Sequence, residues 1–175
     1  MRSPRRVLAA CLILLPVLAL ALWTLAPPGS TWLELTDAGT GRRILSQLLP
    51  DGEQVVLTWT NSLFGLPVTE VFAAGHGILT LTEITFSDPT GREPPRVGPA
   101  EVDDLYHTGG PFKAEGLSRP VSRVVFRVGE LGNPAIRIGS RVVHFAREVG
   151  FGGAVLLVAR KASLRERIAG RMAPG

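Results

Sequence analysis

The chain has 175 residues, of which 45% are hydrophobic, and a formal net charge of +4. This length allows one modest domain with its own core beside a membrane segment. The positive charge lies at the two ends of the chain, so that residues 7–159 are net acidic, with 11 basic and 14 acidic side chains. We therefore do not interpret the charge as a nucleic-acid footprint, and we expect no nucleic-acid partner.

Residues 7–26, VLAACLILLPVLALALWTLA, are an uncharged apolar stretch of 20 residues. A helix of this length spans a hydrocarbon layer of roughly 30 Å, because it rises about 1.5 Å per residue. Arg2, Arg5 and Arg6 precede the stretch and are expected to hold the N-terminus in the cytoplasm. We predict that residues 1–26 are a single-pass anchor in the cytoplasmic (inner) membrane and that the rest of the chain lies in the periplasm.

A cleaved signal peptide is the alternative for the same stretch, since it too has a basic start and an apolar run. The nearest cleavage site would follow Ala26, where Pro27 obstructs cleavage; if cleavage occurs, the domain is secreted to the periplasm. Cys11 is the only cysteine, which excludes an intramolecular disulfide and a thiolate metal site. The LAAC sequence that ends at Cys11 resembles a lipobox, but the apolar run continues for fifteen residues beyond it.

Residues 27–31 are expected to be an extended linker, and residues 32–160 an extracytoplasmic β domain. Alternation predicts a strand at TWLELTD. Residues 43–49 are expected to form another strand, because RRILSQLL is too short and too poorly capped for a helix, and a turn follows at residues 50–52. Residues 54–86 contain three runs rich in β-branched and aromatic residues, separated by NSLFG and AAGHG, which predicts a β-meander. The apolar register changes in the third run, and this predicts a β-bulge near Thr82 and Glu83.

Residues 87–120 contain six prolines and five glycines, and they are expected to form a long loop. Strands are predicted for residues 121–129 and 152–159, the latter buried on both faces, and a hairpin around Gly139 and Ser140. No internal helix is expected. The sequence therefore predicts an all-β fold, a small β-sandwich or partly open barrel of seven to nine strands.

Residues 161–175 are basic and are expected to contain a short amphipathic helix, because Leu164, Ile168 and Met172 repeat every four residues. Ser163 and Glu166 have the spacing of a capping box. Such a helix could lie on the membrane surface or against a partner helix. A frayed tail, or one packed on the domain, is the alternative.

Glu70 is the most informative polar residue of the meander, because it shares a strand face with Val68 and Phe72. A carboxylate in that position must find hydrogen-bond donors or take up a proton. Asn61 is expected to donate to it across the loop, and a purely structural clamp of the loop is the alternative. The residues of the possible ligand-binding or structural cluster are Asn61, Ser62, Pro67, Glu70, Asp103, Asp104 and His107.

Asp103, Asp104 and His107 are the densest polar group of the long loop. They could hold a cation or act as a base, and a solvated acidic loop is the alternative. The three histidines of the chain lack the spacing of a metal site, and there is no GxSxG, P-loop or dinucleotide-binding motif. We expect no catalytic, metal-binding or cofactor-binding residues, no cofactor, and no enzymatic activity.

The segments TWTNSLFGLPVTEVF, ITFSDPTGREPP, VVFRVGELGNPAIRIGSRVVHF and SLRERIAG occur in this order. Together they resemble the bacterial family known as domain of unknown function 1850 (DUF1850), over roughly residues 32–170. Pro67 and Glu70 match the family pattern. Asn61 stands where the family usually has histidine, and residues 88–91 replace a Gly-rich step, so any role of the family histidine is in doubt here.

The resemblance implies a genomic association with TRAP-type transporters of the TAXI subgroup, which import organic acids with an extracytoplasmic receptor. Our leading hypothesis is a non-enzymatic, membrane-anchored accessory domain near a TRAP-type permease or its receptor, because an anchor raises the local concentration of a partner. The alternative is a periplasmic small-ligand-binding or hydrolytic domain, with a site where Asn61, Glu70 and residues 103–107 converge. An envelope assembly factor is a third possibility.

Overall fold

The computed structural model describes residues 30–172, and side chains as far as residue 169. No helix in this part of the chain is both long and apolar enough to cross a membrane. The anchor predicted for residues 1–26, and most of the linker, lie outside the described residues.

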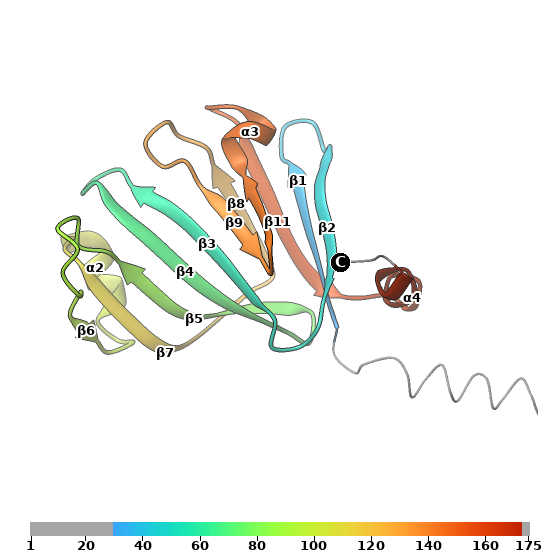
Figure 1. Cartoon of the computed structure of the whole chain (residues 1–175), viewed down its shortest axis with the longest axis horizontal. Helices are drawn as coiled ribbons and strands as arrows, with labels where there is room; N and C mark the ends of the chain where they lie inside the picture. The colour runs from blue at the N-terminus through green and yellow to red at the C-terminus, as the bar shows by residue number, and fades with distance from the viewer. Residues whose placement is uncertain (1–29, 173–175) are drawn as a thin grey trace, which may run out of the picture.

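The described chain is mostly β-structure and forms two sheets, which are antiparallel apart from one short parallel pair at an edge (Figure 1). The four-stranded sheet has the order β2-β1-β11-β8, and the seven-stranded sheet has the order β10-β9-β3-β4-β5-β7-β6. The elements are β1 (Thr31–Asp37), β2 (Arg43–Leu49), β3 (Gln54–Asn61), β4 (Leu66–Gly75), β5 (Ile78–Phe86), β6 (Arg96–Val97), α2 (Val102–Thr108), β7 (Phe112–Val121), β8 (Arg123–Arg127), β9 (Ala135–Ile138), β10 (Arg141–His144), α3 (Phe145–Val149), β11 (Ala154–Lys161) and α4 (Leu164–Met172).

The core lies between the two sheets, because alternate residues of each strand point inward. Leu33 and Leu35 of β1 and Leu157 of β11 face Val55 and Leu57 of β3, all nearly inaccessible to solvent. The all-β prediction is therefore confirmed.

The chain passes between the sheets at one end of the molecule, at the turn before β3 and at Ser122, where β7 runs directly into β8. At this end the turn between β4 and β5 packs against the other sheet. The Gly77 N–H donates to the Thr31 hydroxyl at 3.0 Å, and a Cβ at Gly77 would collide with the backbone of Lys161. Glycine at this position, with a φ of 87°, therefore lets the two sheets meet.

The predicted strands upstream of residue 87 are all present, and the predicted hairpin forms between β9 and β10. The bulge is confirmed as well, since the pairing of β5 with β7 shifts between Leu81 and Glu83. The bulged residue, Thr82, turns its hydroxyl to the carbonyl of Val71 on β4, at 3.0 Å.

Residues 87–120 are not the continuous loop expected from their prolines and glycines. They contain β6, the helix α2 and all but the last residue of the strand β7. Phe112 and Ala114 of β7 are fully buried, so tertiary burial and pairing with β5 outweigh the loop-like composition.

The prediction of seven to nine strands is likewise too low, since the described residues form eleven, and the expected absence of an internal helix is wrong because α2 and α3 are present. The strand predicted for residues 152–159, β11, alternates between buried and half-buried positions rather than being buried on both faces.

The predicted C-terminal helix is present as α4, and its capping box forms. The Glu166 N–H donates to the Ser163 hydroxyl at 3.4 Å, and the Glu166 carboxylate accepts from the Ser163 N–H at 2.9 Å. In Figure 1 α4 lies beside β2 at one end of the molecule, and α2 lies at the other end, beside β6 and β7.

Candidate functional site

Glu70 lies in the middle of β4 and therefore in the interior of the seven-stranded sheet. It pairs with Leu57 of β3 on one side and with Ile84 of β5 on the other. Its neighbours on the same face, Val68 and Phe72, are 1% and 7% exposed. The carboxylate thus faces the space between the sheets, as the alternation predicted.

Two aromatic side chains lower the pKa of this carboxylate from the value that its burial alone would give. The Tyr106 hydroxyl, from α2, donates to Glu70 Oε1 at 2.9 Å. The Trp59 side chain, from β3, lines the same pocket as Glu70 and also lowers its pKa, and its position follows from the register, since Trp59 is two residues from Leu57. The hydrogen-bond donor that we expected Glu70 to require is the phenol of Tyr106.

Burial raises the pKa of Glu70 above its usual value, and the hydrogen bonds from Tyr106 and Trp59 partly oppose that rise. Burial also raises the pKa of Tyr106, and the negative charge of Glu70 raises it further. The phenol therefore keeps its proton over the ordinary pH range and remains a donor. Glu70 is the member of this pair that titrates.

Tyr106 is held in place by aromatic packing. Its ring meets Phe86 of β5 edge-on, with ring centres 5.2 Å apart, and Phe86 stacks on Phe112 of β7 at 4.6 Å. Val102, one turn earlier on α2, is completely buried. The helix is thereby fixed on the inner face of the seven-stranded sheet, and its phenol is fixed toward Glu70.

A pocket of about 240 Å³ opens beside Glu70, between the two sheets. Trp59 and Glu70 belong to the seven-stranded sheet, and the other lining residues come from β8 and from the segment that leads to β9. The Thr60 N–H bonds the Gly132 carbonyl at 2.9 Å and so ties that segment to β3. The pocket is lined by Trp59, Glu70, Val125, Phe126, Arg127, Gly132 and Pro134.

The volume of this pocket corresponds to roughly eight water molecules at about 30 Å³ each, so it suits a small molecule or one side chain. Its walls are mostly apolar, with the carboxylate of Glu70 on one side and Arg127 at an exposed position. A half-buried carboxylate with a raised pKa selects for a hydrogen-bond donor or a positive charge.

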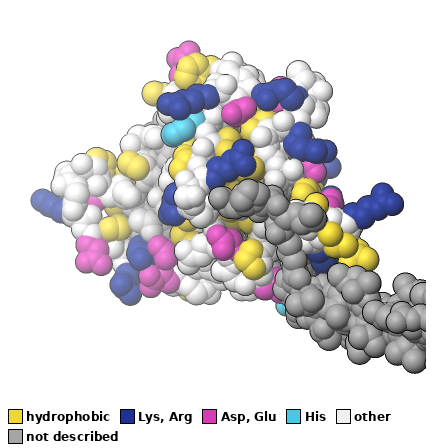
Figure 2. Space-filling view, turned by 45° about the vertical axis from the view of Figure 1, so that its right-hand side comes forward, with side chains coloured by type: hydrophobic (Ala, Val, Ile, Leu, Met, Phe, Trp, Pro, Cys, Tyr) yellow, Lys and Arg dark blue, Asp and Glu magenta, His cyan; other side chains and the backbone are white. Residues whose placement is uncertain are grey.

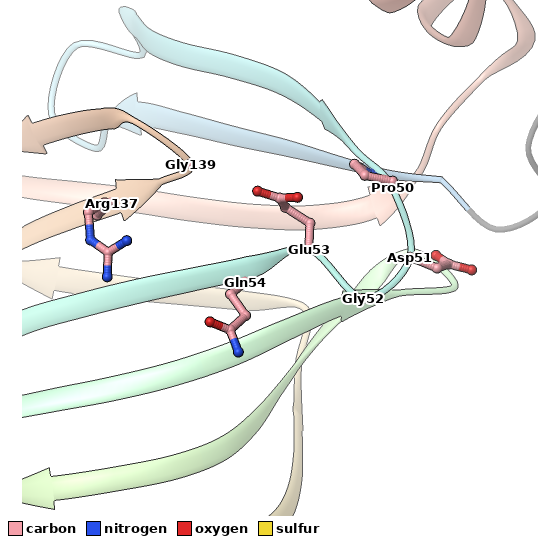
Figure 3. A pocket seen from close by; sticks show the side chains of 7 residues that line it. All are labelled: Pro50, Asp51, Gly52, Glu53, Gln54, Arg137 and Gly139. Carbon is pink, nitrogen blue, oxygen red and sulfur yellow. The ribbon is translucent and has the colours of Figure 1, made fainter.

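A second, larger pocket of about 510 Å³ lies at the other end of β3 (Figure 3). It is formed by the turn at residues 50–52 together with Glu53, Gln54, Arg137 and Gly139. Figure 3 shows Asp51 pointing away from it. Gln54 and Arg137 are exposed, so a ligand there would stay in contact with water. The Glu70 pocket is smaller but combines burial with a perturbed ionisable group, and we regard it as the candidate site.

Asn61 does not donate to Glu70, which corrects the expected hydrogen bond. Its side-chain oxygen accepts from the N–H groups of Leu63 and Phe64, at 2.9 and 3.1 Å. Asn61 pairs with Leu66, four residues along β3 from the partner of Glu70, a separation of about 13 Å. Asn61 therefore clamps the loop, which is the structural alternative considered for it. Ser62 and Pro67 are exposed.

Asp103, Asp104 and His107 lie on α2 and not in a loop, and all three are exposed. Asp103 forms an ion pair with Arg119 of β7 at 2.7 Å. Among residues 30–169, no group of three or more acidic, histidine or cysteine side chains has a geometry that could hold a metal ion. These three residues therefore lie on the outer side of the helix, whereas Tyr106 of the same helix reaches Glu70.

The loop after Asn61 and the helix α2 nevertheless meet. The ring of Phe64 lies within 2.6 Å of the position that a Cβ on Gly109 would occupy. Gly109, which ends α2 with a φ of 78°, is thus the only kind of residue that fits there without displacing the ring. The predicted convergence of Asn61, Glu70 and residues 103–107 on one site is therefore wrong: the two segments meet through Phe64 and Gly109, and of α2 only Tyr106 is hydrogen-bonded to Glu70.

Sequence reasoning missed Trp59 and Tyr106 as site residues. The signal for α2 was present, because Val102, Leu105 and Tyr106 have the i, i+3, i+4 spacing of a helix face and a Gly-Gly pair follows. The prolines on either side of this segment led instead to the prediction of a loop.

Comparison with family models, with curated proteins and with solved structures found no match to this chain.

Proposed function

We propose that the protein is a non-enzymatic accessory domain, anchored in the cytoplasmic membrane, which binds a partner protein through the Glu70 pocket. The motif resemblance makes a TRAP-type permease or its solute receptor the expected partner. The observation that carries the binding role is the half-buried carboxylate of Glu70, which accepts a hydrogen bond from Tyr106 and lines a small pocket.

The free edge of β8 supports a protein partner. In the described sheet β8 pairs with β11 only. Val128 and Ser122, at the two ends of β8, both bond toward β11, so by alternation the backbone groups of Arg123, Val125 and Arg127 point to the open side. Such an edge can accept an extended segment of another chain as an added strand.

Charge suggests which segment would be accepted. Arg123 and Arg127 are exposed two residues to either side of Val125. A second copy of β8 would bring arginines opposite arginines, which is unfavourable, whereas an acidic segment would pair with them. In an added strand the residue opposite Phe126 points inward, so a donor-bearing side chain there would enter the pocket toward Glu70.

The same chemistry argues against the transported organic acid as the occupant. A carboxylate ligand would meet the carboxylate of Glu70 across a pocket of about 240 Å³, and two like charges at that range repel each other. The pocket is therefore suited to a partner of the transport system and not to its anionic cargo.

The experiment is affinity purification of the tagged full-length protein from its native membrane in mild detergent, with mass spectrometry of the recovered proteins. We expect a TRAP permease or its receptor with the wild type and a loss of at least tenfold in recovery with Glu70→Ala or with Arg123→Glu/Arg127→Glu. Arg141→Glu, on exposed β10, is the matched control. Equal recovery by all variants would contradict docking at this pocket.

A second candidate is a binding domain for a small cationic molecule, favoured by the size of the pocket and by its single carboxylate. Trp59 lines the pocket, so its fluorescence reports occupancy. Titration with n-butylammonium should change that fluorescence in the wild type but not in Glu70→Gln. No change in either protein would eliminate small alkylammonium ions as ligands and leave the protein partner.

A further inference from the structure

We propose that α4 lies on the outer surface of the membrane, with Leu164 and Ile168 inserted among the lipids, and thereby orients the domain. This inference goes beyond partner binding and rests on the anchor proposed for residues 7–26.

The first step is the position of α4 relative to the start of the domain. The Ala162 N–H donates to the Ser30 carbonyl at 3.2 Å, and both residues are buried, at 5% and 2% exposed. The helix therefore begins where the chain enters the domain. Only four Cα steps separate Ser30 from Ala26, the last residue of the apolar stretch, a reach of at most about 14 Å.

The second step is the surface that α4 presents. Leu164 and Ile168 are one turn apart on the same side of the helix and are 65% and 47% exposed. Arg165, between them in sequence, is exposed as well. Figure 2 shows hydrophobic side chains exposed beside Lys and Arg side chains on the right of the molecule, the side on which α4 lies in Figure 1.

The third step is that α4 is attached firmly to the end of β11. Both terminal nitrogens of Arg160 contact the Glu166 carboxylate, at 2.8 and 2.5 Å. The Arg167 side chain bonds the Ala162 carbonyl at 3.2 Å. The two exposed apolar side chains thus belong to a held helix and not to a frayed end.

The acidic residue of the first turn, Glu166, is neutralised by Arg160, so the exposed charge beside the apolar pair is basic. A helix with this arrangement inserts its apolar residues at the boundary between headgroups and acyl chains, and its arginines attract anionic lipid. Because α4 begins beside Ser30, which at most about 14 Å of chain separates from the end of the proposed anchor, we assign the membrane as the occupant of this face.

One consequence concerns the pocket. In Figure 1 α2, which supplies Tyr106 to Glu70, lies at the end of the molecule opposite α4. A domain that stands on α4 therefore holds the Glu70 pocket away from the lipid, where a periplasmic receptor can reach it.

The experiment places an environment-sensitive fluorophore on single cysteines in the full-length protein, in a Cys11→Ser background. Ile168→Cys reports on α4, and Val142→Cys is the matched control because Val142, on β10, is equally exposed, at 48% against 47%. The proteins are reconstituted in vesicles of phosphatidylethanolamine and phosphatidylglycerol. We expect blue-shifted emission and quenching by headgroup-labelled lipid at position 168, and water-like emission at position 142.

Two outcomes overturn the inference in different ways. If alkaline carbonate extracts the protein from the vesicles, the anchor itself fails. If the protein resists extraction but position 168 is as water-exposed as position 142, the anchor stands and the membrane contact of α4 fails. A blue shift at 168 that persists in detergent and resists lipid quenchers would also overturn the membrane contact and would assign the face to a second copy of this chain, the only other protein present.

Discussion

Glu70 and Glu166 are the same residue type in opposite surroundings. Glu70 lies inside the larger sheet, where burial raises its pKa. Glu166 lies at the start of α4, where the Arg160 guanidinium, with help from Ser163, lowers its pKa to about 2. Desolvation disfavours the charged form of Glu70, whereas hydrogen bonds and the charge of Arg160 favour the charged form of Glu166.

The partners of the two residues also differ in their distance along the chain. Glu166 bonds residues three and six positions away, so its contacts belong to a local cap. Tyr106 is 36 residues from Glu70, and their contact exists only when α2 docks on the sheet. The difference indicates that Glu166 stabilises the start of α4. The environment of Glu70, in contrast, forms only when the tertiary structure is assembled.

The largest effect should come from removing the ring on which Tyr106 packs. Phe86 is fully buried and contacts the rings of Trp59, Tyr106 and Phe112. Phe86→Ala should lower the free energy of unfolding by about 3–5 kcal/mol, measured by urea denaturation. Leu164→Ala on exposed α4 is the control and should change it by less than about 0.5 kcal/mol. A similar loss of unfolding free energy in both variants would show that the packing around Tyr106 and the exposed face of α4 contribute equally to stability.

The next largest effect should come from removing the hydrogen bond between Tyr106 and Glu70. Tyr106→Phe removes a hydrogen-bond donor from a buried carboxylate, which should cost about 1–3 kcal/mol near pH 7. The missing bond raises the pKa of Glu70 further, so the loss should shrink as the pH falls and Glu70 becomes protonated. Urea titrations at pH 7 and pH 4.5 measure this. A loss that does not depend on pH would mean that Glu70 does not carry the charge in this pair.

A smaller effect is expected at the cap of α4. Ser163→Ala removes the hydroxyl that accepts from the Glu166 N–H, at a cost of about 1 kcal/mol. Ser163→Asn, which keeps a capping oxygen, should recover most of that loss. Helix content by circular dichroism and the urea midpoint report both changes, and equal loss in the two variants would show that the cap does not act through its oxygen.

The smallest effect concerns the pH dependence of the stability that the two glutamates contribute, which should have opposite slopes. The folded pKa of Glu166 is lowered, so its stabilisation is present above pH 4.5 and is lost as the pH falls toward 2. Because the pair with Arg160 is partly exposed, Glu166→Gln should cost less than about 1 kcal/mol at neutral pH.

The folded pKa of Glu70 is raised, so its contribution has the reverse slope and declines as the pH rises above 4.5. Subtracting the pH–stability curves of Glu166→Gln and Glu70→Gln from that of the wild type should give slopes of opposite sign. Two slopes of the same sign would refute the assignment of the two environments.

The local elements could be predicted from the sequence because their signals are local. Alternation marked β1, β3 and β4, the Gly139-Ser140 pair marked a hairpin, and the spacing of Ser163 and Glu166 marked a capping box. The inward orientation of Glu70 followed from its strand face. In each case the deciding contacts lie within a few residues or follow from the period of two in a strand.

The tertiary structure alone decided how these parts meet. Residues 87–120 have the composition of a loop, yet burial of Phe112 and Ala114 against β5 makes a strand of the part from Phe112 onward. Asn61 turned out to clamp its own loop, and Tyr106, from a helix hidden among prolines, supplies the donor that Glu70 requires.

The sequence therefore determined that this chain forms an all-β domain with a carboxylate on an inner face, because strand periodicity is set residue by residue. Which side chains surround that carboxylate was decided by packing between segments far apart in the chain, since burial depends on the whole assembly and not on local pattern.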